Sequence, residues 1–248
     1  MIEDLLKDYP VESRDPNFGS VKFKILNLQM IKRYEFASRF CSGIVIDAAC
    51  GSGYGCPTLL QRSKHLTGID ISKQNIELAM QRYYRHGLDY KIVDMEGELP
   101  FEDSLFDTVV SLETIEHIKN VENLMHSFNR ILKRKGRLIL ATPNGKNTSP
   151  LGRSHYNPFH KKEFSKQELI NLVKENEFKI EGVYGQGILI GYILKSIYKK
   201  GIKPKHLNDK TYLSTIANNL PFFSRIFSKI SPCFVESSKE IILVAQKS

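Results

Sequence analysis

The stretch Ile44-Val-Ile-Asp-Ala-Ala-Cys-Gly-Ser-Gly-Tyr-Gly55 decides the fold, because an apolar run ends in an acid and passes directly into three closely spaced glycines. This pattern predicts a buried strand over residues 43–47 that enters a tight turn facing a ligand, where glycines let the ligand lie against the main chain. A helix over 54–62 would point its free N–H groups at that ligand. The spacing lacks the Gly-Lys-Ser/Thr of a P-loop, and a plain structural turn is the alternative.

Acids also end the next predicted strands. The run His65-Leu-Thr-Gly-Ile-Asp70 ends twenty-three residues after Asp47, where an acid can bind both hydroxyls of a ribose. The predicted strand 90–93 runs into Asp94, and the predicted strand 106–111 is followed by Glu113. The first two strands and their acids therefore favour a nucleotide-type ligand over a plain turn.

Helical and strand patterns alternate along the rest of the chain. An amphipathic helix begins at Asn27, ahead of the first strand, and this alternation is typical of a parallel, doubly wound α/β sheet. The remaining predicted helices cover 73–86, 119–132 and 165–176, and the remaining predicted strands cover 137–142, 178–184 and 240–246.

Composition bounds the class of protein. The 248 residues, 41% of them hydrophobic, suffice for one domain with an insertion. No signal peptide and no apolar run of membrane-spanning length is recognised, and the four cysteines form no C-x-x-C pair, so a cytoplasmic protein without a disulfide framework is expected. Residues 1–128 hold 14 Lys and Arg against 19 Asp and Glu, whereas residues 129–248 hold 22 against 8. The basic half suits a phosphate-bearing acceptor or a membrane surface, or is only solvated surface.

Taken together, D-A-A-C-G-S-G, G-I-D-I-S, V-D-M-E with L-P-F, and F-D-T-V-V-S resemble the class I S-adenosylmethionine (SAM)-dependent methyltransferases. The resemblance implies a Rossmann-like, seven-stranded α/β sheet with helices on both faces and an antiparallel last strand. It also implies a single methyltransferase domain over 1–248. Its expected parts are an arm and helix (1–42), a cofactor-binding core (43–186), a basic amphipathic insertion or cap (187–235) and a final strand (236–248).

The resemblance also implies roles in binding SAM. Gly51 and Gly53 would carry the methionine part, with Asp47 holding its amino group, and Asp70 would take the ribose hydroxyls. Asp94 would accept from the adenine amino group, and Met95 and Ile71 would lie against the faces of the adenine ring. Glu113 would lie at the end of strand four beside the cofactor, and Tyr34 would lie over the cofactor. For Tyr34, a core-facing aromatic is the alternative.

A second constellation, Glu113-Thr-Ile-Glu116-His117, puts two carboxylates and an imidazole on one face of a helical turn. With His160 it forms a candidate site for Mg²⁺ or Mn²⁺, in which Glu113, Glu116, His117 and His160 are the ligands. It resembles metal-dependent small-RNA 2′-O-methyltransferases, and E-x-x-E-H alone resembles ubiquinone-pathway O-methyltransferases. Two alternatives stay open: His117 or His160 acts as a metal-free general base, or Glu116 and His117 only brace the turn.

The motifs R-Y-x-F-A, E-T-I-E-H, T-P-N and N-P-F-H-x-x-E-F, followed by Tyr184-Gly-Gln186, resemble methyltransferases of bacterial surface-glycan and sugar biosynthesis. O-methylation of a sugar or glycan hydroxyl, free or lipid-linked, is therefore expected, with His117, His160 and Glu116 as catalytic candidates. RNA 2′-O-methylation, quinone-type O-methylation and a SAM-binding interaction protein are the alternatives. No RNA-binding module is recognised, so nucleic acid is not expected as a partner. The sequence leaves the oligomeric state open.

The segment 187–235 carries eight Lys and Arg against one acid, with apolar residues at helical spacing. This pattern suits a peripheral contact with the anionic inner face of a membrane, where lipid-linked glycans are built. A helical cap over the acceptor pocket, or a dimer face, is the alternative.

Overall fold

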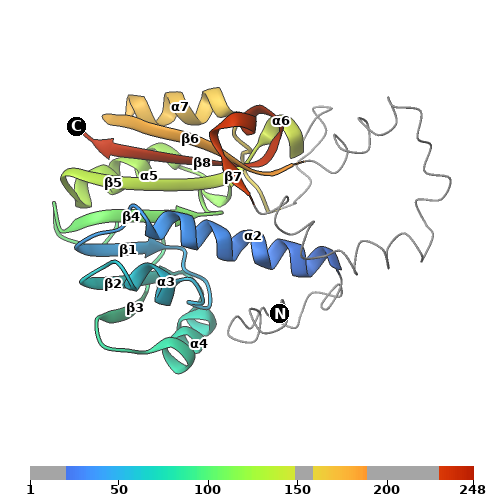
Figure 1. The fold of residues 1–248 in the computed structure, drawn as a ribbon. Coiled ribbons are helices and arrows are strands. Elements are labelled where there is room, and N and C mark those ends of the chain that lie inside the picture. The colour runs from blue at the N-terminus through green and yellow to red at the C-terminus, as the bar shows by residue number, and fades with distance from the viewer. Residues whose placement is uncertain (1–20, 149–158, 189–228) are drawn as a thin grey trace, which may run out of the picture.

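The computed structural model describes residues 21–148, 159–188 and 229–248 (Figure 1). The arm up to residue 20 and residues 189–228 of the predicted insertion lie outside the described residues. Among the residues described, no helix has the length and apolarity needed to cross a bilayer.

The sheet confirms the predicted class I architecture. Its strand order is β3-β2-β1-β4-β5-β8-β6-β7, with β1 to β5 parallel and β8 antiparallel to both β5 and β6. The sheet has one strand more than the seven expected. The additional strand is β7, a two-residue edge strand that pairs with β6. The strands are β1 (Ile44–Ala48), β2 (His65–Asp70), β3 (Leu88–Ile92), β4 (Phe106–Leu112), β5 (Leu132–Pro143), β6 (Phe178–Ile188), β7 (Ile230–Ser231) and β8 (Ser238–Lys247).

Helices cover both faces of this sheet (Figure 1). One face packs against α5 and α7 through residues such as Phe128 and Leu169, and the other packs against α2, α3 and α4 through residues such as Ala37, Leu59 and Ala79. The helical elements are α2 (Val21–Ser38), α3 (Cys56–Leu60), α4 (Lys73–Tyr83), α5 (Val121–Ile131), α6 (Gly145–Thr148), α7 (Lys166–Glu175) and the 3-10 turns η1 (Ile115–His117) and η2 (Pro232–Ser237).

Local capping explains where several helices begin. The Ser72 hydroxyl accepts from the Asn75 N–H at the start of α4, and Asn120 caps α5 in the same way. A capping box formed by Ser165 and Glu168 opens α7. These side chains satisfy N–H groups that lack partners inside the helix. The starts predicted from the sequence lie within two residues of those observed.

Element ends were predicted less well. The helix expected to run to residue 132 ends at Ile131, and β5 begins directly at Leu132 because Leu132 pairs with Phe106 across the sheet. β6 continues to Ile188 through pairing with β8, which starts at Ser238 and not at residue 240. Cross-strand hydrogen bonding, which a single strand's pattern does not reveal, sets these ends.

The chain crosses over between β1 and β4, which are neighbours in the sheet but far apart in sequence. In an open α/β sheet, ligands bind beyond the carboxyl ends of the strands at such a switch point. The turn after β1 and the segment after β4 therefore lie side by side at the place where a ligand is expected.

Candidate functional site

The turn after β1 leaves room beside its backbone at Gly51. Gly51 has φ +55°, and a side chain placed there would meet nothing within 4 Å. Its N–H donates a 3.0 Å hydrogen bond to Asp70 Oδ2 at the end of β2, while Asp70 Oδ1 accepts from the Ser72 N–H at 2.9 Å. Asp70 thus shapes the turn as well as facing the site.

Gly53 has a different local role. A Cβ at this position would lie 2.6 Å from Ala79 Cβ and 2.8 Å from the Tyr90 hydroxyl, and φ is +79°. Glycine is therefore required here so that the turn can pack against α4 and β3, and of these two glycines Gly51 is the one that offers open space to a ligand.

Asp47 is fully buried beneath this turn, and burial raises the pKa of its carboxyl to about 7. The Cys56 thiol donates to Asp47 Oδ2 at 3.4 Å. Tyr34 is also buried: its ring lies where a Gly55 side chain would be, and it meets the Tyr54 ring edge to face at 5.3 Å. Tyr34 thus packs against the turn at Gly55.

The predicted adenine residues follow β2 and β3. Ile71 is 64% exposed. Asp94 is exposed and accepts from the Glu96 N–H at 2.9 Å, while Met95 is buried. The pairing of Asp70 with Ile92 across β2 and β3 brings these two strand ends together.

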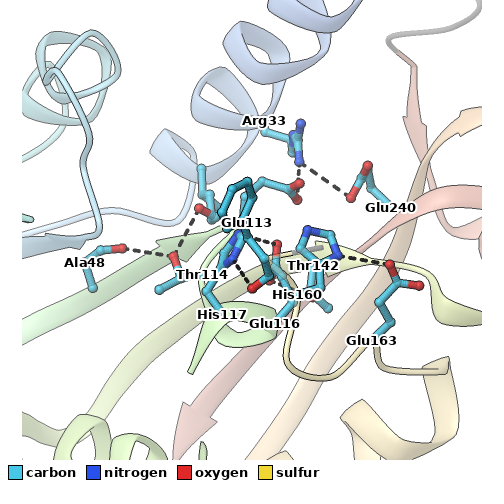
Figure 2. Close-up of polar contacts among 12 residues, drawn as sticks. Arg33, Ala48, Glu113, Thr114, Glu116, His117, Thr142, His160, Glu163 and Glu240 are labelled. Carbon is cyan, nitrogen blue, oxygen red and sulfur yellow. Dashed lines mark hydrogen bonds and ion pairs between the residues drawn. The ribbon is translucent and has the colours of Figure 1, made fainter. Parts of the chain in front are cut away.

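An arginine that the sequence did not single out as a site residue reaches from α2 to Glu113 and Glu240 at the edge of the site (Figure 2). Arg33 of α2 is 5% exposed, and its Nη1 is 2.5 Å from Glu113 Oε1 and 3.7 Å from Glu240 Oε2. Burial opposes its charge, but the two carboxylates raise the pKa of Arg33 above its usual value. Burial and the Glu113 carboxylate raise the pKa of Glu240 well above the ordinary range. The partners of Arg33 lie far from it in the sequence, so no local charge pattern predicts these ion pairs.

Glu116 lies in η1, a 3-10 turn rather than the expected α-helical turn, and its side chain is fully buried. The Thr142 hydroxyl of β5 donates to Glu116 Oε2 at 2.9 Å, and Oε1 has no hydrogen-bond partner among the described residues. Burial, with a contribution from Glu113, raises the pKa of Glu116 to about 8. The Glu116 carbonyl accepts from the Lys161 N–H at 2.6 Å, which joins η1 to the 159–164 segment.

His117 and His160 face each other, with ring centroids 4.9 Å apart and planes at 81° (Figure 2). His117 Nδ1 lies 3.2 Å from the Phe159 carbonyl, and His160 Nδ1 lies 2.9 Å from Glu163 Oε1. Both partners accept only, so each neutral ring carries its proton on Nδ1 and its lone pair on Nε2.

Three of the four predicted metal ligands come together. One candidate ligand atom from each of Glu116, His117 and His160 lies within 4.8 Å of the others. Glu113 stands apart because it has φ +55° and pairs with Arg33, which draws its carboxylate toward α2. The face shared by Glu113, Glu116 and His117, expected from helical spacing, is therefore absent in this turn.

Comparison with known proteins agrees with this geometry. Residues 46–140 match the family described as "Methyltransferase domain". A relative from Mycolicibacterium smegmatis named "Probable S-adenosylmethionine-dependent methyltransferase/" is 29% identical over 61% of this chain and 58% of its own length. A ubiquinone biosynthesis O-methyltransferase of Pelagibacter ubique is 24% identical over 70% of this chain and 78% of that protein.

The matched region spans 58% of the Mycolicibacterium smegmatis relative and 51% of a relative from Mycobacterium tuberculosis, so the chain covers between half and three fifths of the first curated relatives. A solved SAM-dependent methyltransferase from Thermotoga maritima has the same fold, with a TM-score of 0.62 at 17% identity over 91% of this chain and 93% of that one. Residues 46–140 thus match a methyltransferase domain, and the strand order and the open glycine turn belong to the fold that class I, SAM-dependent methyltransferases share.

Proposed function

We propose that the protein transfers the methyl group of SAM to a hydroxyl of a sugar or glycan. The observation that carries the proposal is the facing pair His117 and His160, whose rings are held through Nδ1 so that the basic lone pair of each neutral ring is on Nε2. A hydroxyl acceptor needs a group that removes its proton, and two imidazoles held in this way suit that task.

The turn after β1 fits SAM. Gly51 leaves open space for the methionine part, and Asp70, Ile71 and Asp94 lie in order along neighbouring strand ends for the ribose and adenine. SAM supplies an electrophilic methyl carbon on a positively charged sulfur. The chain's own contribution is to align the acceptor oxygen with that carbon and to keep water out.

In the metal-free form of the proposal, His117 or His160 takes the hydroxyl proton at Nε2. The Phe159 carbonyl and the Glu163 carboxylate hold the opposite ring nitrogens, and Glu163 also stabilises the imidazolium that forms on His160. Glu116 Oε1 lies 4.0 Å from His117 Nε2, so a Glu116 that has released its proton would stabilise charge on His117.

The same residues fit a divalent ion. The buried Glu116 Oε1 lacks a hydrogen-bond partner among the described residues, and a bound ion would be coordinated by this oxygen. Two imidazoles oriented through Nδ1 by a carbonyl and a carboxylate are typical of metal ligands held by outer contacts. A bound Mg²⁺ or Mn²⁺ would lower the pKa of an acceptor hydroxyl.

The sugar acceptor is favoured by the motif resemblance described above, and a quinone-type catechol is the second candidate. The second is favoured by similarity to a protein named a ubiquinone biosynthesis O-methyltransferase. A lipid-linked acceptor of either kind would bring the protein to the inner face of the membrane. Residues 189–228, which would make that contact, lie outside the described part of the chain.

The test is a search for products that gain one methyl group. Purified protein, isotopically labelled SAM and extracts of nucleotide sugars or lipid-linked glycans, or a catechol such as 3,4-dihydroxybenzoate, are analysed by mass spectrometry. Labelled product is expected with the wild type and with His126→Ala, a matched control because His126 is exposed on α5. His117→Ala and His160→Ala should abolish it. If SAM binds but no acceptor gains label, the O-methyltransferase proposal fails and a SAM-binding interaction protein remains.

A further inference from the structure

Two consecutive residues of α2 contact two different loops of the site. The Tyr34 ring packs against Gly55 at the end of the cofactor turn, where even a single Cβ would lie 2.2 Å from it. Arg33 contacts Glu113, which opens the segment 113–117 (Figure 2). One rigid helix therefore touches both the cofactor side and the His117 side of the site.

Arg33 is paired to an unusual degree. A buried guanidinium is costly unless it is paired, and here the Glu113 carboxylate lies at 2.5 Å and the carboxyl group of Glu240, whose pKa is raised by burial, lies at 3.7 Å. Glu113 follows β4, and Glu240 lies in β8, so one side chain links α2 to two strands on either side of β5. An anchor for α2 alone would need only one of these partners.

Glu113 is held in a conformation that its residue type disfavours. Its φ of +55° is left-handed, and a non-glycine residue adopts such a φ at some cost in free energy. The backbone N–H of Glu113 donates to the Ala141 carbonyl at 2.8 Å, and the Arg33 pair fixes the side chain. The ion pair thus stabilises the strained residue from which η1 begins.

The segment after Glu113 also makes hydrogen bonds on its other sides, among them the Thr142 hydroxyl to Glu116 Oε2 and His117 Nδ1 to the Phe159 carbonyl. Thr114 Oγ1 donates to the Ala48 carbonyl at 3.4 Å, and the Glu116 carbonyl accepts from the Lys161 N–H. Because η1 is only three residues long, a change in direction at Glu113 would displace Glu116 and His117 together.

We propose that Arg33 is a positioning residue. Through Glu113 it sets the direction of the segment 113–117, and with Tyr34 it fixes the spacing between the cofactor turn and the pair His117 and His160. The inference deepens the proposed function, because it names the residue that aligns the two halves of that site. Its first test needs no acceptor and so can fail separately from the proposed function.

The test follows the histidine ring signals by NMR in Arg33→Met, Glu113→Gln and the double variant. We expect both single variants to shift the signals of His117 and His160 in the same direction, and the double variant to shift them no further. The signals of His65 and His126, on β2 and on the exposed side of α5, should not move. Arg33→Lys should restore part of the wild-type spectrum.

Arg137→Met is the matched control. It removes an arginine from a 3.0 Å ion pair with Glu181 on the surface of the sheet and should leave the His117 and His160 signals unchanged. With an acceptor in hand, Arg33→Met should lower kcat about a hundredfold, the scale of a misalignment near 1 Å, with little change in the KM for SAM.

Unmoved His117 and His160 signals in folded Arg33→Met would overturn the proposal, as would additive shifts in the double variant. If Arg33→Met does not fold, Glu113→Gln decides alone, because Glu113 is 29% exposed and its loss leaves no cavity in the core. Unshifted signals in that variant would reduce Arg33 to an anchor of α2.

Discussion

The Thr142 hydroxyl donates a 2.9 Å hydrogen bond to the buried carboxyl of Glu116. This bond connects the end of β5 to η1. This bond satisfies one oxygen of Glu116 and leaves the other directed toward His117 Nε2, 4.0 Å away. A buried carboxyl with one satisfied oxygen is poised either to hold a proton or to meet a cation. The protonation state of Glu116 at a given pH distinguishes these two roles.

Glu116→Gln should change the pH dependence of stability. The pKa of Glu116 is about 8 in the folded protein against an ordinary value of 4.5, so the unfolded chain releases this proton at lower pH. The wild type should therefore lose stability as pH rises from about 4.5 to 8, whereas a glutamine side chain in its place cannot ionise. By urea unfolding, the free energy of unfolding of the variant relative to that of the wild type should rise by about 4 kcal/mol between pH 5 and pH 9.

Glu175→Gln is the control for this measurement, because Glu175 is exposed near the end of α7. It should unfold like the wild type at both values of pH. The free energy of unfolding of Glu116→Gln could also differ from that of the wild type by the same amount at pH 5 and pH 9. That result would show that Glu116 is ionised throughout.

Metal binding can be measured without any acceptor by titrating the protein with Co²⁺ and recording its visible absorption. If the cluster holds an ion, His117→Ala and His160→Ala should abolish the absorption, and Glu163→Gln, which removes the carboxylate from His160 Nδ1, should weaken binding about 10–100-fold. His126→Ala should bind as the wild type does. Equal Co²⁺ affinity in all variants would leave the two histidines only the roles of base or brace.

The two glycines of the cofactor turn should respond differently to substitution. Gly53→Ala would place a Cβ 2.6 Å from Ala79 Cβ and should destabilise the fold by about 2 kcal/mol or more. Gly51→Ala meets nothing within 4 Å and should cost about 1 kcal/mol from its positive φ, yet it should weaken binding of S-adenosylhomocysteine by filling the cofactor's space. Thermal unfolding and calorimetry separate the two effects. Full affinity in Gly51→Ala would move the cofactor away from this turn.

Asp70→Ala should weaken the binding of S-adenosylhomocysteine by about 2–4 kcal/mol. The substitution removes the acceptor for the ribose hydroxyls and also the hydrogen-bond partner of the Gly51 N–H. The matched control is Asp89→Ala on β3, which removes an exposed carboxylate paired with His65. Calorimetry should show wild-type affinity for the control. Unchanged affinity in Asp70→Ala would remove the ribose assignment.

Prediction from sequence worked where the signal is local. An apolar run, a glycine turn and a capping side chain each report on their own few residues, so β1, β2 and the starts of α4 and α7 were correct to within about one residue. Prediction was weaker where pairing with another strand sets the length or the existence of an element. The full length of β5 depends on its pairing with β4 and β8, and β7 exists only because β6 lies beside it.

The sequence by itself determined where the residues predicted to bind the cofactor lie. Gly51, Asp70 and Asp94 follow successive strands, and the order of parallel strands brings their carboxyl ends to one edge of the sheet whatever the details of packing. Only the tertiary structure decided the other half of the site. The pairing of Arg33 with Glu113, eighty residues later, takes Glu113 out of the expected ligand set. The meeting of His117 with His160 depends on how the 159–164 segment hydrogen-bonds to Glu116. Such contacts arise from packing between distant segments, which no local pattern of residues encodes.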